Sequence, residues 1–189
     1  MTVVSAEYDY RLLRTCGEDV FISANVEIRR PHLVAVGSHV AVDSGFYCTT
    51  AAEVGDYIHI GPYVSVIGGA HGLLRMGHFS GISAGARIIC ASDQFRGEGL
   101  VGTVIPDRYR DKVTIAPVVL EDFAHVATNA VIMPGVTMSE GSVVGAGAVV
   151  TQSTKPWTIY VGVPAKAIRM RPRDKMLAAA KQLGYRIER

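Results

Sequence analysis

The sequence predicts an all-β fold, a parallel β-helix, from a six-residue repeat of apolar residues and from the places where that repeat breaks. From residue 120 onward an aliphatic side chain returns at every sixth position, and a small or β-branched residue stands four positions later. Hexapeptide periodicity is typical of solenoids in which each hexad forms one flat face and turns a corner. A β-sandwich would show strands with a period of two instead. The aliphatic positions are Leu120, Val126, Ile132, Met138, Val144 and Val150, and the small positions are Ala124, Ala130, Val136, Ser142, Ala148 and Thr154.

Three hexads are expected to make one coil of a triangular prism. Residues about 18 positions apart then stack at the spacing of neighbouring strands, ~4.8 Å, and the coils together bury a continuous aliphatic core. The same repeat occurs earlier in the chain, so the prism is expected to span residues 20–155. The earlier inward positions are Val36, Val42, Cys48, Val54, Ile60, Val66, Met76, Ile82 and Ile88.

The breaks in the repeat predict the remaining elements in chain order. Residues 1–19 are expected to cap the open end of the prism. Four extra residues after Val66 predict a small protrusion at a corner. The polar segment at about 94–113 cannot stack as coils, so it is expected to be an extruded loop, and a loop of about twenty residues in a compact domain is usually functional. Residues 156–189 are expected to form a crossing segment and then a C-terminal helix, with Asp174 as its cap and an end at about Gly184.

The composition argues against several classes of protein. The formal net charge is only +2, so no nucleic acid or membrane surface is indicated as a partner. The three cysteines show no metal-ligand spacing. No run of ~18 apolar residues and no secretory leader pattern is present. We therefore expect a cytoplasmic protein with no membrane insertion and no metal.

One histidine and one aspartate are expected to meet beside the two irregular segments. His71 closes the hexad that begins at Val66, and Asp93 closes the hexad that begins at Ile88. If the four extra residues protrude at the corner, these two side chains stack on adjacent coils. A carboxylate beside an imidazole orients a general base and stabilises its protonated form. The alternative is that His71 is an exposed loop residue and that Asp93 caps a turn.

His125 is the second choice for a general base. It closes the hexad of Leu120 and points outward on a different edge, so it would serve a site on a facing subunit. In the extruded loop, Gln94 and Glu98 are candidates to bind the hydroxyl groups of a sugar substrate.

The last coils suggest a site for a long flexible ligand. Their small outward residues leave backbone amides open, and cations follow at the C-terminal end. Coenzyme A has the matching order of groups, with phosphates, then a chain of two amides, then a thiol. Small residues at these positions are also what close stacking of the coils demands. The candidate cofactor-binding residues are Ala127, Gly145, Ala146, Lys166 and Arg169.

Four stretches of the chain together resemble the hexapeptide-repeat acyltransferases, and most closely the acetyltransferases of bacterial surface-polysaccharide gene clusters. The resemblance covers roughly residues 20–172. It implies a left-handed β-helix, a homotrimer with active sites between subunits, and acetyl-CoA as co-substrate along the C-terminal coils. The four stretches are VIGGAHG with HFSGISAGA, ASDQFRGEGL with TVIP, AVIMPGVTMSEGSVVGAGAVVT, and KPWTIYVGVPAKAIR.

The resemblance also implies the reaction, with one departure at the site. The expected activity is acetylation of a sugar, favouring the amine of a nucleotide-linked amino or deoxy sugar for lipopolysaccharide biosynthesis. Asp93 stands where galactoside-type and maltose-type members carry their catalytic histidine. Either His71 beside it or His125 from another subunit then takes the proton. A neutral amine also reacts without a strong base when it is well positioned.

Two other functions share the same fold. A γ-carbonic-anhydrase-like metal enzyme would need three converging histidines, and the spacings of His59, His71 and His78 place them at different corners or heights. A non-catalytic scaffold would need neither the polar loop nor the features that match coenzyme A.

Overall fold

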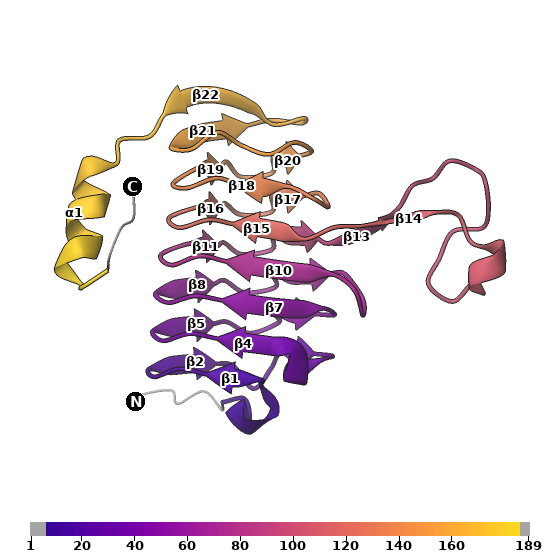
Figure 1. The fold of residues 1–189 in the computed structure, drawn as a ribbon, viewed down its shortest axis with the longest axis horizontal. Helices are drawn as coiled ribbons and strands as arrows, with labels where there is room; N and C mark the ends of the chain where they lie inside the picture. The colour runs from indigo at the N-terminus through magenta and orange to yellow at the C-terminus, as the bar shows by residue number, and fades with distance from the viewer. Residues whose placement is uncertain (1–6, 186–189) are drawn as a thin grey trace.

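Three parallel sheets form the faces of a prism, and each coil contributes one short strand to each face (Figure 1). This computed structural model describes residues 7–185, so residues 1–6 of the predicted cap and residues 186–189 of the predicted C-terminal segment lie outside the described residues. Side chains at the hexad positions point into the prism and fill it. The parallel β-helix predicted from the repeat is confirmed.

Each face is a ladder of strands from successive coils. The first face contains β1 (Thr15–Cys16), β4 (Val34–Val36), β7 (Ala51–Val54), β10 (Leu73–Met76), β15 (Val118–Leu120) and β18 (Thr137–Met138). The second face contains β2 (Val20–Ile22), β5 (Val40–Val42), β8 (Ile58–Ile60), β11 (Gly81–Ile82), β16 (His125–Val126), β19 (Val143–Val144), β21 (Thr158–Val161) and β22 (Lys166–Met170). The third face contains β3 (Glu27–Ile28), β6 (Tyr47–Cys48), β9 (Ser65–Ile67), β12 (Arg87–Ile89), β17 (Val131–Ile132) and β20 (Val149–Val150).

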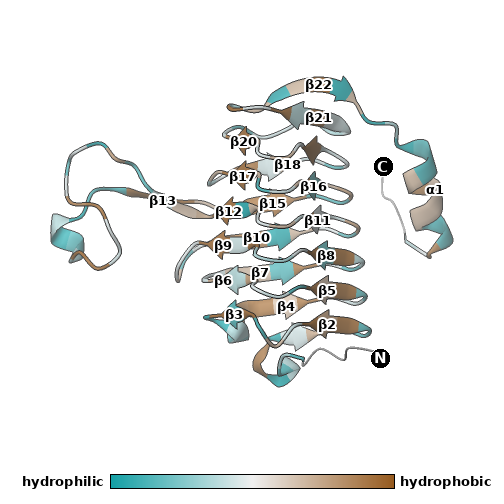
Figure 2. Ribbon diagram, turned by 180° about the vertical axis from the view of Figure 1, so that it is seen from behind, coloured by the Kyte–Doolittle hydropathy of each residue, from teal (hydrophilic) through white to brown (hydrophobic). Residues whose placement is uncertain are grey.

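The register of the strands follows the repeat. Val126 pairs with Val144 on the second face, and Ile132 pairs with Val150 on the third. The six aliphatic positions from residue 120 are at most 2 % exposed, as are the small positions Ala124, Ala130, Val136, Ser142 and Ala148. Figure 2 shows the strands β5 and β8 as hydrophobic, in keeping with this interior.

The prism is longer at both ends than the predicted span of 20–155. β1 already pairs with β4, and β21 continues the second face beyond β19. Pro156 does not stop the stacking because it occupies a corner position whose amide is not needed for the ladder. At the corresponding position one coil earlier, the amide of Glu140 bonds a side chain, Oε2 of Glu121. β22 then pairs antiparallel with β21 and ends the sheet.

The extruded segment is a two-stranded arm rather than a loop (Figure 1). β13 (Ala91–Asp93) leaves the corner between the third and first faces, and β14 (Val113–Ile115) returns antiparallel to it. A short 3₁₀ helix, η3 (Asp107–Tyr109), lies near the tip. Two more 3₁₀ helices, η1 (Tyr10–Leu12) and η2 (Pro31–Leu33), lie before β1 and before β4.

Stacked rings line the corner between the first and second faces, which we call the aromatic corner. One ring from each of five turns sits at positive φ, and neighbouring ring centroids are 4.4 to 5.7 Å apart. The C-terminal helix α1 (Asp174–Gln182), predicted to run from Asp174 to about Gly184, covers this corner with buried Ala180. Asp174 is the first helical residue rather than the cap. The five rings are His39, Tyr57, Phe79, Phe123 and Trp157.

No helix within residues 7–185 has both the length and the apolar character needed to cross a bilayer.

Candidate functional site

Asp93 lies where the arm leaves the prism, on β13 opposite Val113. Its Oδ1 is buried and has no hydrogen-bond partner among residues 7–185. A buried carboxylate oxygen without a partner is costly, because it has lost its water and gained nothing in return. Such an atom at the base of a protruding arm is suited to accept a hydrogen bond from a ligand.

The two loop residues predicted to bind sugar hydroxyl groups also form contacts across the arm. Nε2 of Gln94 donates to Oγ1 of Thr114 at 3.1 Å. Glu98 forms an ion pair with Lys112 at 3.4 Å. Both pairs hold β13 and β14 together near Asp93.

A residue that the sequence analysis did not single out fastens the arm. Asp111 is only 3 % exposed, and its carboxylate accepts the backbone N–H groups of Arg96, Gly97 and Lys112 at 2.8, 3.2 and 2.7 Å. The backbone N–H of Asp111 in turn donates to the carbonyl of Leu100 at 2.9 Å. No sequence signal marks this residue, because its partners are amides of an irregular segment.

The predicted contact between His71 and Asp93 is not formed within the protomer. The four extra residues fold back on themselves, with the N–H of Gly72 donating to the carbonyl of Gly68 at 3.0 Å. His71 is exposed in this turn, while the chain one coil later leaves the corner as β13. Among residues 7–185, no hydrogen bond or ion pair joins the side chains of His71 and Asp93.

His125 lines a groove of about 450 Å³ on the second face. Its strand β16 pairs with β11, which pairs with β8, so Gly81 lies between His125 and His59 in the ladder. His59 is held by Asp43, with Nε2 to Oδ2 at 2.9 Å. Ser83 follows β11 and also lines the groove. The sequence alone does not mark Gly81 as important, because its place between the two histidines follows only from the register of the coils.

The environment of His125 keeps its ring neutral. Burial lowers its pKa, and the nearby charge of Arg171 lowers it further against the opposing effect of the hydrogen bond to Phe123. Nδ1 lies 3.0 Å from the carbonyl oxygen of Phe123. Because a carbonyl only accepts, the proton is on Nδ1 and the lone pair is on Nε2.

The groove and the arm lie on different edges of the prism. His125 belongs to the second face and Ser83 directly follows strand β11 of that face, whereas Asp93 lies at the corner between the other two faces. Figure 1 shows the arm projecting on the side of the prism away from α1, which lies beside the strands of the second face. One protomer alone therefore does not bring the groove and Asp93 together.

The backbone amides predicted to be free for coenzyme A are in part occupied. The N–H of Ala127 donates to Val144 at 2.9 Å, and the N–H of Gly145 donates to Tyr160 at 2.8 Å. This prediction is wrong for both amides because the coil-to-coil ladder continues through them. Ala146, Lys166 and Arg169 are exposed at the C-terminal end of the prism, where the sequence placed them.

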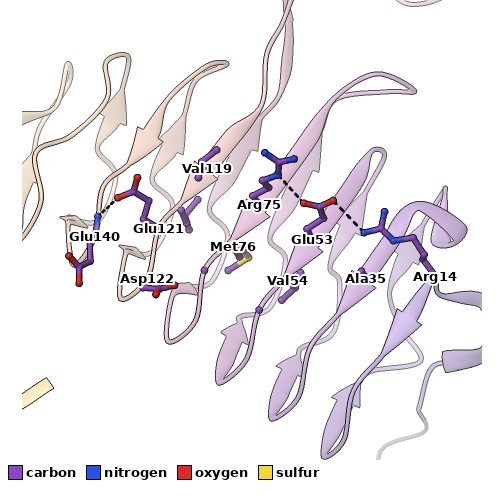
Figure 3. A pocket seen from close by; sticks show the side chains of 13 residues that line it. Arg14, Ala35, Glu53, Val54, Arg75, Met76, Val119, Glu121, Asp122 and Glu140 are labelled. Atoms are coloured by element: carbon purple, nitrogen blue, oxygen red, sulfur yellow. Dashed lines mark hydrogen bonds and ion pairs between the residues drawn. The ribbon is translucent and has the colours of Figure 1, made fainter. Parts of the chain in front are cut away.

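A broader groove of about 850 Å³ follows the first face (Figure 3). Glu53 lies between Arg14 and Arg75 and forms ion pairs with both, at 3.4 and 2.8 Å. None of the predicted catalytic residues lines this groove.

Within residues 7–185, no group of three or more His, Cys, Asp or Glu side chains is arranged to hold a metal ion. His59 is bonded to Asp43, and Nδ1 of His78 accepts the backbone N–H of Asp56 at 3.0 Å. The three histidines that a carbonic-anhydrase-like site would need do not converge.

Known proteins that are similar to this chain share its fold, and several of them are acyltransferases. No protein-family model matches the chain. It is 27% identical over 163 residues to dTDP-4-amino-4,6-dideoxy-D-glucose acyltransferase of Escherichia coli, covering 84% of this chain and 82% of that protein. It is 29% identical to a chloramphenicol acetyltransferase of Agrobacterium fabrum, covering 83% and 76%.

Solved structures of AntD, an N-acyltransferase from Bacillus cereus, superpose on nearly the full length of this chain. The TM-score is 0.89 at 29% identity, over 96% of this chain and 99% of AntD. These AntD structures hold coenzyme A together with dTDP or dTDP-4-amino-4,6-dideoxyglucose, and some carry a substitution of one serine or of one aspartate ten positions later.

A hexapeptide-repeat acetyltransferase of Vibrio cholerae shares the fold, with a TM-score of 0.56 at 21% identity. The stacked hexads, the arm and the near full-length likeness to acyltransferases lead to one conclusion: the chain is an enzyme similar to the hexapeptide-repeat acyltransferases in fold and in sequence.

Proposed function

We propose that the chain transfers an acetyl group from acetyl-CoA to the amino group of a nucleotide-linked amino dideoxysugar. The support is the likeness to AntD and to the E. coli enzyme, both of which are described with a dTDP-linked 4-amino-4,6-dideoxyglucose. Nucleotide-linked sugars are precursors, so we place the reaction in the cytoplasm and in the synthesis of surface polysaccharide.

The observation that carries the proposal is the unpartnered oxygen of Asp93. A serine and an aspartate ten positions apart were replaced in the AntD complexes. Ser83 and Asp93 are the only serine and aspartate with that spacing and order in this chain. Oδ1 of Asp93 is buried and unbonded among the described residues, so an amino group would find an acceptor already desolvated there.

Asp93 then has a positioning and charge-stabilising task. Its carboxylate holds the acceptor nitrogen beside the thioester carbon, and a fixed near-attack geometry supplies most of the acceleration when the nucleophile is an amine. His71, Gln94 and Glu98 lie at the same corner or along the arm and would surround the sugar.

We propose that the active site lies between two protomers of a homotrimer. Ser83 belongs to the groove on the second face and Asp93 to the arm corner, so a shared ligand needs the groove of one copy and the arm of its neighbour. The arm carries exposed apolar side chains suited to such a contact, with Phe95, Leu100 and Val104 exposed by 70, 59 and 90 %. Lys166, Arg169 and the exposed backbone at Ala146 would bind the phosphates and pantetheine of coenzyme A.

The first experiment measures release of the coenzyme A thiol with purified protein, acetyl-CoA and dTDP-4-amino-4,6-dideoxyglucose. Release is expected with the amino sugar and not with the matching 4-hydroxy sugar nucleotide. Asp93→Asn is expected to raise KM for the amino sugar by about tenfold or more, because one charge-assisted hydrogen bond contributes about 1.5–3 kcal/mol. Asp107→Asn, at the exposed tip of the same arm, is the matched control. Absence of release with every amino sugar nucleotide tested would contradict the proposal.

The second experiment tests the shared site. Ser83→Tyr, which fills the groove, and Asp93→Ala are each expected to inactivate the protein. Unfolding and refolding a 1:1 mixture should restore roughly a quarter of the sites, because an intact groove then faces an intact arm in that share of interfaces. No recovery in mixed oligomers would place both residues in one protomer's site and refute the arrangement.

A further inference from the structure

The ring of His125 is fixed by its backbone surroundings rather than by a carboxylate. Phe123, two residues earlier, adopts a left-handed conformation with φ of 61°. Its carbonyl oxygen receives Nδ1–H of His125 at 3.0 Å. This bond sets both the tautomer and the plane of the ring, and it leaves Nε2 with a free lone pair.

Gly81 keeps the space in front of Nε2 open. A Cβ atom placed on Gly81 would lie 3.1 Å from Cδ2 and 3.2 Å from Nε2 of His125. The ring edge that carries the lone pair therefore faces the backbone of the neighbouring coil inside the groove. Ser83 lines the same groove two residues further along the chain.

Arg171 also donates a hydrogen bond to the carbonyl of Phe123. Its Nη1 donates to the carbonyl of Phe123 at 2.9 Å and to the carbonyl of Gly141 at 3.0 Å. One oxygen thus accepts from the imidazole and from the guanidinium at once. The positive charge near the ring disfavours a second positive charge on it, so His125 stays a neutral acceptor at neutral pH.

Other histidines near the faces are less suited to accept a proton from a ligand. Nδ1 of His78 is occupied by the N–H of Asp56. His39 is bonded through Nδ1 to Asp19, and His59 is bonded through Nε2 to Asp43, each at 2.9 Å, so one ring nitrogen of each is already engaged by a side chain. His125 combines a groove, a fixed tautomer and a free Nε2.

We propose that Nε2 of His125 is the proton acceptor for the acceptor amine, and that Arg171 is a positioning residue that holds and tunes it through the carbonyl of Phe123. The inference rests on the proposed function. Nε2 takes one proton from the ammonium group of the sugar. The nitrogen lone pair then forms the C–N bond to the acyl carbon and the C–S bond breaks. The second N–H proton goes to the leaving thiolate, and His125 returns its proton to solvent.

The decisive variant is His125→Asn, because asparagine keeps an N–H near the position of Nδ1 and removes Nε2. We expect kcat with the amino sugar at pH 7 to fall by about 10²–10⁴, the usual contribution of a general base. The loss should shrink as the pH rises toward the pKa of the sugar amine, because the ammonium then loses its proton without help. His32→Asn, on the exposed 3₁₀ helix η2, is the control and should leave kcat unchanged.

A second variant leaves the histidine in place, so that misfolding at position 125 cannot explain the result. Gly81→Ala is expected to push the ring by a few tenths of an ångström and to narrow the groove in front of Nε2. kcat/KM for the amino sugar should fall at least tenfold, with unchanged thermal unfolding. Long-range ¹⁵N–¹H spectra of the wild-type protein should also show the Nδ1–H tautomer at neutral pH, a readout independent of turnover.

Arg171→Met tests the positioning role. The charged and titratable groups that face the ring or share its groove are Arg171, His59 with its partner Asp43, and Tyr57. The Arg171 charge lowers the pKa of His125, so its removal should raise that pKa. The acid limb of the kcat profile should therefore move to higher pH. A fall in stability without a shift of this limb would assign Arg171 a structural role only.

The possible failures separate the two proposals. A wild-type protein that releases no thiol with any amino sugar nucleotide overturns the proposed function and this inference with it. An active wild-type protein whose His125→Asn variant keeps its kcat at pH 7 overturns only the inference. Loss of activity in His71→Asn with full activity in His125→Asn would assign the proton to His71 instead.

Discussion

Replacement of Asp111 by alanine should loosen the arm and leave the prism intact. The buried carboxylate satisfies three backbone N–H groups, those of Arg96, Gly97 and Lys112. A hydrogen bond to a charged group contributes about 1.5–3 kcal/mol, and a buried donor left unpaired costs about 1–3 kcal/mol. The three bonds share one carboxylate and are not additive, so we expect a loss of about 3–6 kcal/mol in the free energy of local opening.

The arm stands outside the hydrophobic interior, so this loss should stay local. None of the inward hexad positions belongs to residues 91–115, and the coils contact only their neighbours. Since 1.4 kcal/mol is a factor of ten, hydrogen-exchange protection of the three amides should fall by about 10²–10⁴. The urea midpoint of the prism should change little. Asp111→Asn keeps the shape and one acceptor oxygen, so its effect should be intermediate.

The assay is native-state hydrogen exchange by mass spectrometry, with urea unfolding followed by circular dichroism on the same samples. kcat/KM for the amino acceptor is expected to fall with the protection of the arm, because Asp93 lies at its base. Unchanged protection in Asp111→Ala would refute the anchoring role. A urea midpoint that falls in parallel with the protection would refute the separation of arm and prism.

Three further predictions concern the prism and its aromatic corner. Leu120→Ala, at a fully buried position, should destabilise the protein by about 3–5 kcal/mol in urea unfolding, and Leu120→Met should cost less than about 1.5 kcal/mol. Burial raises the pKa of the Cys48 and Cys90 thiols to about 11, so a thiol reagent at pH 8 should modify neither in the native protein and both in urea. Tyr185→Phe removes a 2.7 Å hydrogen bond to Asp56 and should cost about 1 kcal/mol. Burial opposes ionisation of Asp56, yet the bonds from Tyr185 and a backbone amide lower its pKa overall, so this stabilisation is present above about pH 4 and should disappear as the pH falls through the lowered value.

The repeat predicted the fold because its information is local. Within each hexad the residue types alone indicate which side chain points inward. Buried positions such as Val126 and Ile132 could therefore be predicted without knowing which distant residues they contact. The ends of the prism were harder to predict. Cys16 already pairs in β1, before any complete hexad, and Pro156 occupies a corner where its missing N–H is not required.

The candidate site could be predicted only in part, because it depends on how irregular segments fold. Counting placed His71 and Asp93 on adjacent coils, but the turn between Gly68 and Gly72 closes on itself. Asp93 was recognised as unusual through the family resemblance, and its unpartnered oxygen is visible only in three dimensions. The importance of Gly81 depends on the register that places it between two histidines.

The residues proposed to act in the reaction lie where the chain departs from its regular six-residue repeat, or are held by residues that lie there. A left-handed non-glycine residue costs of order 1–3 kcal/mol, and Phe123 adopts that conformation at the aromatic corner. The rings of Phe79 and Trp157 pack on either side of Phe123, with centroids 5.1 and 5.7 Å away, and aromatic pairs contribute about 0.5–1.5 kcal/mol each against this cost. The same backbone conformation aims the Phe123 carbonyl at the imidazole of His125. Glycine at position 123 would relieve the strain but would remove a ring from the ladder, so the residue that stabilises the corner is also the one that fixes the tautomer of the proposed base.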